Sequence, residues 1–150
     1  PEESVAWNDP YISITGNFQS VKIRHNGSNY IIGNIHGIWQ PDGKSDSEDR
    51  LWQSEKLAAF FGQEQGKKIL CGDFNLRPET ESIAMLGRTM RNLIKEHGIM
   101  TTRNKLYPEA DKWKDYISDY VFVSPDTAVE RFEVLDDVVS DHLPLVLEFS

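Results

Sequence analysis

Two late segments of the sequence are apolar on both faces of a strand, and they constrain the fold more than any other feature. Residues 119–124 (DYVFVS) and 143–149 (LPLVLEF) carry Val, Leu and Phe at neighbouring positions. Alternate side chains of a strand leave on opposite faces, so such strands need an apolar layer on each side. The sequence therefore predicts a sheet that is covered from both sides.

The rest of the chain alternates strands with helices. Asn26-Gly27 predicts a hairpin turn, because both residues accept positive φ at low cost. One apolar stripe predicts a helix over 51–65, with Ser47 as its N-cap and Gly66 as the left-handed residue that ends it. This order indicates one α/β domain, with helices on one face of a sheet and a second sheet on the other. The predicted strands are 12–25, 30–36, 69–74, 119–124 and 143–149, and the predicted helices are 51–65, 81–86 and 90–97.

Composition narrows the classes of protein. With 150 residues, of which 39% are hydrophobic, the chain is long enough for one globular domain. No apolar run approaches the roughly 20 residues that span a bilayer, and no secretory signal pattern is visible, so the cytoplasm is the favoured compartment. A net charge of −8 argues against holding nucleic acid by bulk electrostatics, but a site with a divalent cation supplies its own positive charge. Two basic groups, Arg88/Arg91/Lys95 and Arg103/Lys105, are interpreted as solvated surface.

The segment ILCGDFN ends an apolar strand with a carboxylate and a carboxamide, Asp73 and Asn75. If extended geometry persists, both side chains leave on one face and Phe74 points into the core. The carboxylate can bind Mg²⁺ or align a water, and the carboxamide can donate to a phosphate oxygen that gains charge. The alternative is a plain turn, since Asp and Asn commonly form turns at strand ends.

The segment SDHLPLVL places Ser140, Asp141 and His142 before an apolar strand. A serine-hydrolase triad is excluded here, because neighbouring side chains of an extended segment diverge and the chain has no Gly-x-Ser-x-Gly elbow. Asp141 near a metal and His142 as a general base fit better, since imidazoles titrate near physiological pH. The alternative is that both residues cap a turn.

Two further polar residues stand at strand ends. Asp119 precedes the strand 119–124 and can accept a hydrogen bond from an imidazole, with Asp115 as its competitor. His36, in GNIHG, ends the strand 30–36; the alternative for this lone histidine is a structural role.

Four segments in this order, GNIHG, GDFN, SDYVFVS and SDHLPL, resemble the endonuclease/exonuclease/phosphatase superfamily. That superfamily includes DNase I-like nucleases, abasic-site endonucleases, inositol polyphosphate 5-phosphatases and neutral sphingomyelinases. The resemblance runs over about 30–149 and corresponds to the C-terminal part of such a domain. It implies the C-terminal part of a four-layer α/β/β/α sandwich of the DNase I-like type.

The resemblance also implies a chemistry: a metal-dependent phosphoesterase, with in-line attack of water on a phosphate ester and phosphodiesters slightly preferred. Mg²⁺ is the implied cofactor and Mn²⁺ the alternative. The implied substrate is a nucleic acid, a phospholipid or an inositol phosphate. Transferred by position, the site residues are His36 on the scissile phosphate, Asp73 on the water or metal, Asn75 on the transition state, His142 as general base, Asp119 as its partner and Asp141 at the metal.

The sequence departs from that family in its first residues. The family's early Asn and its principal glutamate ligand have no counterpart, because Glu2 and Glu3 stand in a polar stretch with no apolar strand before them. Residues 1–150 are therefore expected to be a partial domain that lacks the N-terminal metal-ligand segments and has little activity alone. The alternative is a non-catalytic binding module without a metal site. A sheet face left open would favour self-association, or cover by residues 1–20.

Overall fold

The computed structural model describes residues 16–108 and 116–150. Its strands are β1 (Asn17–His25), β2 (Ser28–His36), β3 (Lys67–Asp73), β4 (Arg91–Asn92), β5 (Asp119–Val123), β6 (Val129–Val134) and β7 (Leu145–Phe149), and its helices are α1 (Glu48–Gln63), α2 (Glu81–Gly87) and α3 (Leu93–Glu96). One sheet has the order β1-β2-β3-β5-β4, and β6 and β7 form a second sheet of two strands. No helix among these described residues is long and apolar enough to cross a membrane.

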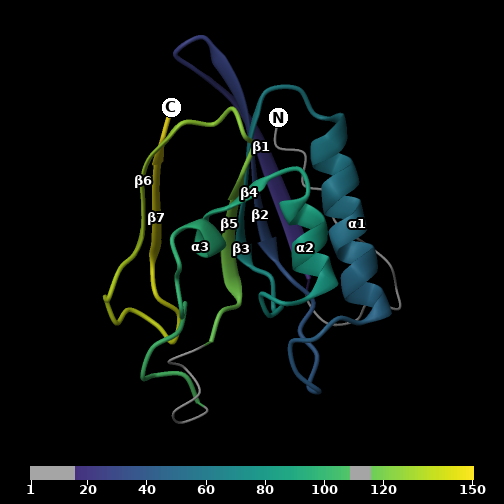
Figure 1. Cartoon of the computed structure of the whole chain (residues 1–150), viewed down its shortest axis with the longest axis vertical. Coiled ribbons are helices and arrows are strands. Elements are labelled where there is room, and N and C mark those ends of the chain that lie inside the picture. Colours follow the sequence, from purple (N-terminus) through teal and green to yellow (C-terminus); the bar gives the residue numbers. More distant parts are fainter. Residues whose placement is uncertain (1–15, 109–115) are drawn as a thin grey trace.

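The elements form layers around the five-stranded sheet. Helices α1 and α2 lie on one side of this sheet, and the β6–β7 pair lies on the other side (Figure 1). On the helix side, the ring of Phe18 packs edge-to-face on Phe60 and Phe61, with centroids 5.2 and 6.1 Å apart. Leu70 and Phe122 are fully buried in the same core. The α/β class is confirmed, with helices on one face and a second sheet on the other.

The β1–β2 hairpin forms as the sequence predicts. The strands pair in register from Asn17↔His36 to His25↔Ser28, and the turn residues Asn26 and Gly27 have φ of 49° and 80°. Two consecutive positive φ values match the twist of the flanking strands, which explains why Asn-Gly is selected here.

Helix α1 begins as predicted but ends early. The Ser47 hydroxyl accepts a hydrogen bond from the Arg50 amide at 3.4 Å, so it caps the helix. The predicted stop at Gly66 is wrong, because the helix ends at Gln63 and the next residue is extended. Gly66, with φ of 106°, instead turns the chain into β3, where a Cβ would lie 2.6 Å from the Asn29 carbonyl oxygen.

Two elements were not predicted. Residues 90–97 contain the short strand β4 followed by the single turn of α3, where one helix was expected. Strand β6 was missed because two adjacent charged residues, Glu130 and Arg131, break the alternation of apolar and polar side chains, and only Phe132 of its six residues is buried. It is a surface strand held by its pairing with β7.

The two late strands differ in burial. Strand β5 buries four of its five residues, as predicted for a strand that is covered on both sides. Strand β7 is half-buried at four of its five positions, so the same prediction is wrong for it. Among the described residues β7 pairs only with β6, and no further layer covers its outer face.

Candidate active site

Three strand ends meet at one edge of the five-stranded sheet. Strands β2 and β3 are parallel, because α1 crosses over between them, so His36 lies beside Asp73. Strand β5 is antiparallel to β3, which places Asp119 on the other side of Asp73. A pocket of about 460 Å³ opens at this edge; its lining residues are His36, Trp39, Lys44, Asp73, Asn75, Arg103, Tyr107, Pro108, Asp141 and His142. Five of the six predicted site residues line this pocket, and the sixth, Asp119, is bonded to one of them.

His142 is held by Asp119. The Nδ1 atom of His142 lies 2.8 Å from Asp119 Oδ1. The other oxygen of Asp119 accepts hydrogen bonds from the hydroxyls of Thr102 at 2.6 Å and Ser118 at 3.2 Å. With its carboxylate held on both oxygens, Asp119 fixes the imidazole ring and favours a proton on Nδ1. That tautomer leaves Nε2 as a proton acceptor. The competitor, Asp115, lies outside the described residues.

The free nitrogen of His142 faces two carboxylates. Its Nε2 lies 3.8 Å from Asp73 Oδ2 and 4.0 Å from Asp141 Oδ2. Both distances exceed a hydrogen bond. A water that bonds Nε2 would therefore lie next to both carboxylates.

The end of β3 is a turn, so the alternative that the sequence left open for Asp73 and Asn75 is the one that forms. The strand ends at Asp73, and Asn75 has a left-handed φ of 54°. Asp73 Oδ1 accepts a hydrogen bond from the Asn75 amide at 2.8 Å, a side-chain turn that Asp and Asn favour. Phe74 is buried as predicted. Asp73 and Asn75 also line the pocket, so the same two residues form the turn and part of the site.

The carboxamide of Asn75 is fixed from two sides. Its Nδ2 donates to the Gly37 carbonyl at 3.1 Å, and its Oδ1 accepts from Lys44 Nζ at 3.0 Å. Asn75 is only 3% exposed, so neither contact competes with much water. One hydrogen of Nδ2 remains for a group in the pocket.

Gly72 sets the spacing of β2 and β3 next to the site. Its φ is 133°, and a Cβ at this position would lie 1.9 Å from the Ile35 carbonyl oxygen. Any side chain would push β2 away from β3. The close approach that aligns His36 with Asp73 therefore depends on glycine.

Arg103 is a site residue that the sequence did not reveal, and its assignment to solvated surface is wrong. It is 4% exposed, and its guanidinium donates to Asp141 Oδ2 at 2.7 Å and to Asp73 Oδ2 at 3.3 Å. It also donates to the Ser118 hydroxyl at 2.9 Å. Its neighbour Lys105 is exposed, as expected. Arg103 also forms an isolated β-bridge with His142, 39 positions later, and no local pattern could have indicated contacts at such separations.

Lys44 is a second residue that was missed. It is 7% exposed, donates to Asn75, and lies 5.2 Å from the centre of the Tyr116 ring. Burial disfavours the ammonium and lowers the pKa of Lys44 to about 8, although the nearby carboxylate of Asp73 partly opposes the shift. A lysine in a polar loop gives no sign of this in the sequence.

Several residues at this pocket could act as ligands of a divalent cation. Asp73, Asp119 and His142 each offer one ligand atom within 4.8 Å of the others. Asp119 is already bonded to His142 and Thr102, so Asp73 and Asp141 are the carboxylates that face the pocket. Carboxylate oxygens are the ligands that Mg²⁺ prefers, and one or two of them suffice when a phosphate completes the shell. The residues present therefore fit such a cation. The guanidinium of Arg103 donates to the Oδ2 atoms of the same two carboxylates.

Comparison with known proteins identifies the family. The sequence model of the Endonuclease/Exonuclease/phosphatase family matches residues 5–142. The chain belongs to this family. No curated protein sequence matches the chain.

Solved structures share the fold of this family member. A mannosyl-6-phosphatase of Bacteroides thetaiotaomicron VPI-5482 has a TM-score of 0.67 at 21% identity, over 90% of this chain and 56% of that one. D. rerio TDP2 in complex with a single-strand DNA product has a TM-score of 0.75 at 15% identity, over 100% and 67%. The human Nocturnin catalytic domain with bound sulfate has a TM-score of 0.61 at 19% identity, over 90% of this chain and 54% of that one. The DNase I-like fold is thus shown, and the chain spans little more than half the length of most of these proteins.

Proposed function

We propose that the chain carries the general-base part of a Mg²⁺-dependent phosphoesterase site that prefers phosphodiesters. One observation carries the proposal: His142, held by Asp119 at 2.8 Å, turns its free nitrogen toward two carboxylates in a pocket. Family membership supports phosphoesterase chemistry in general. Magnesium and the substrate go beyond that support, and Mn²⁺ is the alternative cation.

His142 acts as the base in this proposal. Water bound at Nε2 loses a proton to the imidazole as its oxygen attacks phosphorus, and Asp119 stabilises the imidazolium that forms. The ester bond from phosphorus to the leaving oxygen breaks in the same in-line step, and the leaving alcohol takes a proton from solvent. The hydroxyls of Thr102 and Ser118 keep Asp119 in place during this step. Asp73, 3.8 Å from the same nitrogen, orients the water.

Positive and neutral donors bind the phosphate. Asn75 offers the free hydrogen of its fixed carboxamide, His36 lines the same pocket, and Lys44 adds positive charge directly behind Asn75. Donors that are held before the reaction stabilise developing charge without reorganising. Asp73 and Asp141 would hold the Mg²⁺, which neutralises charge on the phosphoryl oxygens when bound.

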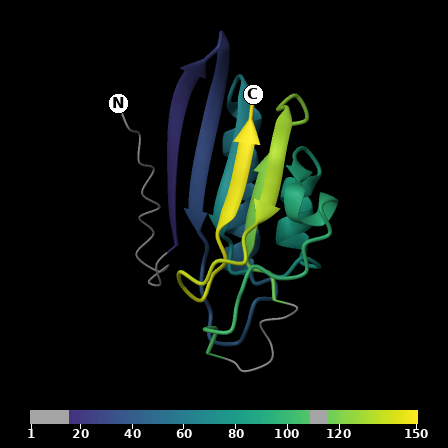
Figure 2. The ribbon, with the colours of Figure 1, turned by 90° about the vertical axis from the view of Figure 1, so that its left-hand side faces the viewer.

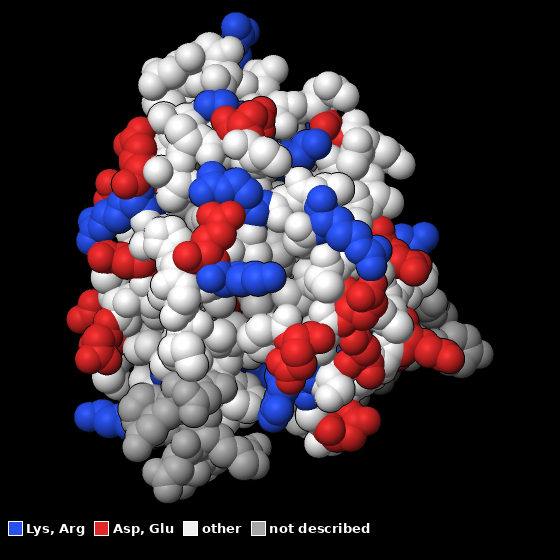
Figure 3. All heavy atoms as spheres, in the orientation of Figure 1, with Lys and Arg blue, Asp and Glu red and all other residues white. Residues whose placement is uncertain are grey.

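The preference for a phosphodiester has support from the pocket wall. Trp39 lines the pocket and is 48% exposed, and Tyr107 lines it as well. Exposed aromatic rings beside a phosphate site suit a substrate with a flat group, such as a nucleotide base. On the face in Figure 3, the described Lys and Arg side chains are interspersed with Asp and Glu, so this face carries no basic track. A nucleic acid would therefore be held through the pocket.

We also propose that this chain alone turns over substrate slowly or not at all, as a partial domain. Among the described residues two carboxylates, Asp73 and Asp141, line the pocket, and Arg103 donates to both, so a cation has a competitor and few ligands. The same contacts favour the second candidate, a binding module that holds an anion without a metal.

A Mg²⁺ titration followed by NMR distinguishes the two candidates. We expect saturable binding at millimolar or lower Mg²⁺, with shifts at Asp73 and His142, and its loss in Asp73→Asn. His25→Ala is the matched control, since His25 is exposed at the hairpin, and its titration should equal that of the wild type. Absence of specific binding in the wild type would favour the metal-free binding module.

A further inference from the structure

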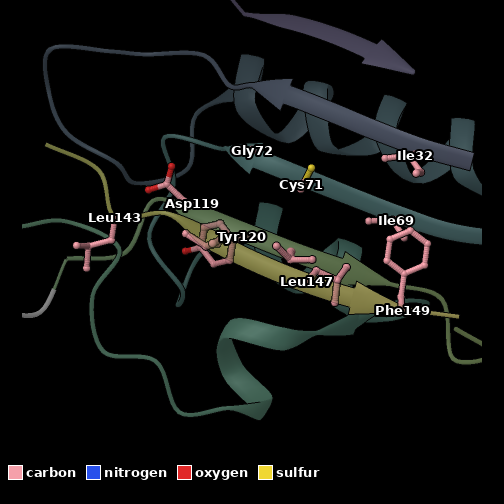
Figure 4. Close-up of a pocket in the computed structure, with 11 residues that line it drawn as sticks. Ile32, Ile69, Cys71, Gly72, Asp119, Tyr120, Leu143, Leu147 and Phe149 are labelled. Atoms are coloured by element: carbon pink, nitrogen blue, oxygen red, sulfur yellow. The ribbon is translucent and has the colours of Figure 1, made fainter. Parts of the chain in front are cut away.

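The loop 37–47, between β2 and α1, brings positive charge to the active-site pocket. Trp39 and Lys44 of this loop line the pocket, and in Figure 2 the loop lies at the same end of the sheet as residues 100–108. A second groove, between the sheet and β7, adds no such charge. Figure 4 shows the carboxylate of Asp119 at one end of it, and the described residues that line it include no lysine or arginine. The position of Lys44 therefore depends on how the loop is held.

The side chain of Arg50 closes this loop. Arg50 follows the N-cap Ser47 in the first turn of α1 and is 2% exposed. Its guanidinium donates to three backbone carbonyls of the loop: Nε to Ile38 at 3.1 Å, Nη1 to Ser45 at 2.6 Å and Nη2 to Gly43 at 2.8 Å. One side chain thus binds both ends of the loop.

The core of the protein does not explain an arginine at this position. Arg50 lies on the buried stripe of α1 together with Leu57 and Phe61, where an apolar side chain would need no hydrogen bonds. A buried cation is costly unless its donors have acceptors. The planar guanidinium holds its donors in a fixed fork, so it can bind several carbonyls at once, which a lysine ammonium on its flexible stem does less well. The loop that it binds therefore explains the arginine.

The anchored loop fixes Lys44. This residue lies between Gly43 and Ser45, whose carbonyls bind Arg50, and its own carbonyl accepts a hydrogen bond from the Arg77 amide at 3.0 Å. With its backbone held on both sides, Lys44 directs its side chain inward. It is 7% exposed, and its Nζ donates to the carboxamide beneath the pocket at 3.0 Å.

Lys44 in turn fixes the orientation of Asn75. An ammonium has only donors, so the carboxamide must turn its oxygen toward Lys44. Its Nδ2 then faces the Gly37 carbonyl, 3.1 Å away, and the pocket. The reversed carboxamide would place an NH₂ group against the ammonium and an oxygen against the carbonyl. The donor that Asn75 offers to the pocket thus depends on Lys44, and the place of Lys44 depends on the loop.

We propose that Arg50 is a positioning residue for phosphate binding, which acts through Lys44 and Asn75. This rests on the proposed function, in which Asn75 binds the phosphate. Arg50 is not among the residues that line the pocket, so it acts only through the loop. Donors that are held in place before a ligand arrives bind its charge without reorganising. Release of the loop should therefore weaken anion binding.

The variant Arg50→Lys tests the proposal, because it keeps the charge but cannot hold three carbonyls in the same way. We expect its dissociation constant for inorganic phosphate, from an NMR titration, to be at least about 10-fold higher than that of the wild type, the usual loss with one hydrogen bond to a charged group. Arg88→Lys is the matched control. The side chain of Arg88 is more than half exposed, so this variant should bind phosphate as the wild type does.

The pKa of Lys44 gives a second readout that does not depend on phosphate. Burial lowers the pKa of Lys44 to about 8 in the wild type. In Arg50→Lys, water should reach the released ammonium and bring the pKa closer to 10.5, although the charge at position 50 is unchanged. The ¹³Cε chemical shift of Lys44 against pH measures this value. Leu70→Ala, which weakens the core elsewhere, should leave the pKa of Lys44 at about 8.

A folded Arg50→Lys variant that keeps either the phosphate affinity or the Lys44 pKa of the wild type would overturn the proposal. A wild type that binds no phosphate would contradict the proposed function, and the pKa of Lys44 would still decide the role of Arg50.

If circular dichroism shows that Arg50→Lys does not fold, hydrogen exchange in the wild type provides the test. The guanidinium hydrogens of Arg50 should exchange with solvent at least about 10-fold more slowly than those of the exposed Arg88. Equal exchange rates would show that Arg50 does not hold the loop.

Discussion

Two regions of the five-stranded sheet are built in opposite ways: the polar edge, where the ends of β2, β3 and β5 carry the site, and the open face of β1, which carries Val21 and Ile23. At the polar edge, Asp119, Asn75 and Arg103 all have fixed partners, and no buried side-chain polar atom among the described residues lacks a hydrogen bond. On the open face, Val21 and Ile23 are 44% and 38% exposed, and among the described residues β1 pairs with β2 alone. In the part of the chain that the structure describes, the polar groups of the site therefore have their partners, whereas apolar side chains of β1 stay partly exposed. Mutations at the two regions should act on different quantities.

Among the residues of the polar edge, replacing Arg103 should have the largest effect on stability. Arg103→Met removes a buried guanidinium and leaves Asp73 and Asp141 side by side without their cation. Breaking a buried ion pair typically costs about 3 kcal/mol or more, and partial exposure of Asp141 places this case near the low end. Urea unfolding of the variant measures the loss.

The matched control is Arg88→Met. Arg88 pairs with Glu81, and both side chains are more than half exposed, so its free energy of unfolding should change by less than about 0.5 kcal/mol. Equal losses in the two variants would show that Arg103 is not a special support of the polar edge.

Removing His142 should leave stability unchanged but reduce reactivity. Its side chain is 32% exposed, so His142→Ala should fold normally. Any Mg²⁺-dependent hydrolysis of a phosphodiester should fall at least about 10²-fold, the usual loss with a general base. The assay uses a chromogenic diester, and His25→Ala serves again as control. Near-normal turnover in His142→Ala would show that His142 is not the general base.

Lys44 should make stability rise with pH. Its pKa is about 8 in the folded chain and near 10.5 when unfolded, so the unfolded state binds more protons between these values. The free energy of unfolding should therefore increase by on the order of 1–3 kcal/mol from pH 8 upward. The raised pKa of the Cys71 thiol and of the Tyr120 phenol acts in the opposite direction.

Lys44→Met isolates that contribution. The difference in unfolding free energy between wild type and Lys44→Met should grow as pH rises from 8 to 10, because only the wild type gains from deprotonating Lys44. A difference that stays constant over this range would mean that the buried lysine keeps its ordinary protonation.

The smallest effect is expected on the open face. Val21→Ser should change the free energy of unfolding by less than about 0.5 kcal/mol, because the side chain is already 44% exposed. Leu70→Ala, on the covered face of the same sheet, should lose about 2–5 kcal/mol. Denaturant titrations at low protein concentration make the comparison. A large loss from Val21→Ser would mean that the face is not open.

Local sequence was enough to predict much of this molecule. The hairpin at Asn26-Gly27 and the cap at Ser47 depend on neighbouring residues, and both formed. The polar residues at the ends of β2, β3 and β5 also converge, because strand order alone brings those ends together.

What was missed depends on contacts between distant positions. Arg103 is buried by Asp73 and Asp141, and Lys44 by Asn75, over separations of 30 to 38 residues. Strand β6 is stable only through its pairing with β7, which no periodicity reveals. At Asn75 the sequence left two conformations open, extended and turn, because both local preferences compete at a strand end. The tertiary hydrogen bonds to Gly37 and Lys44 decide between them.

Gly72 has a consequence for how this chain can change over generations. His142, Asp141 and Asn75 act on a ligand, so a lineage that no longer hydrolyses anything can replace them and still fold. Gly72 has no such freedom, since a single added carbon would strike the Ile35 carbonyl oxygen and separate two central strands. In a descendant that has drifted from catalysis to binding, the glycine should outlast the histidine. A glycine at the position of Gly72 would then indicate descent from this family in a protein that has lost Asp73, Asn75 and the hydrolytic activity.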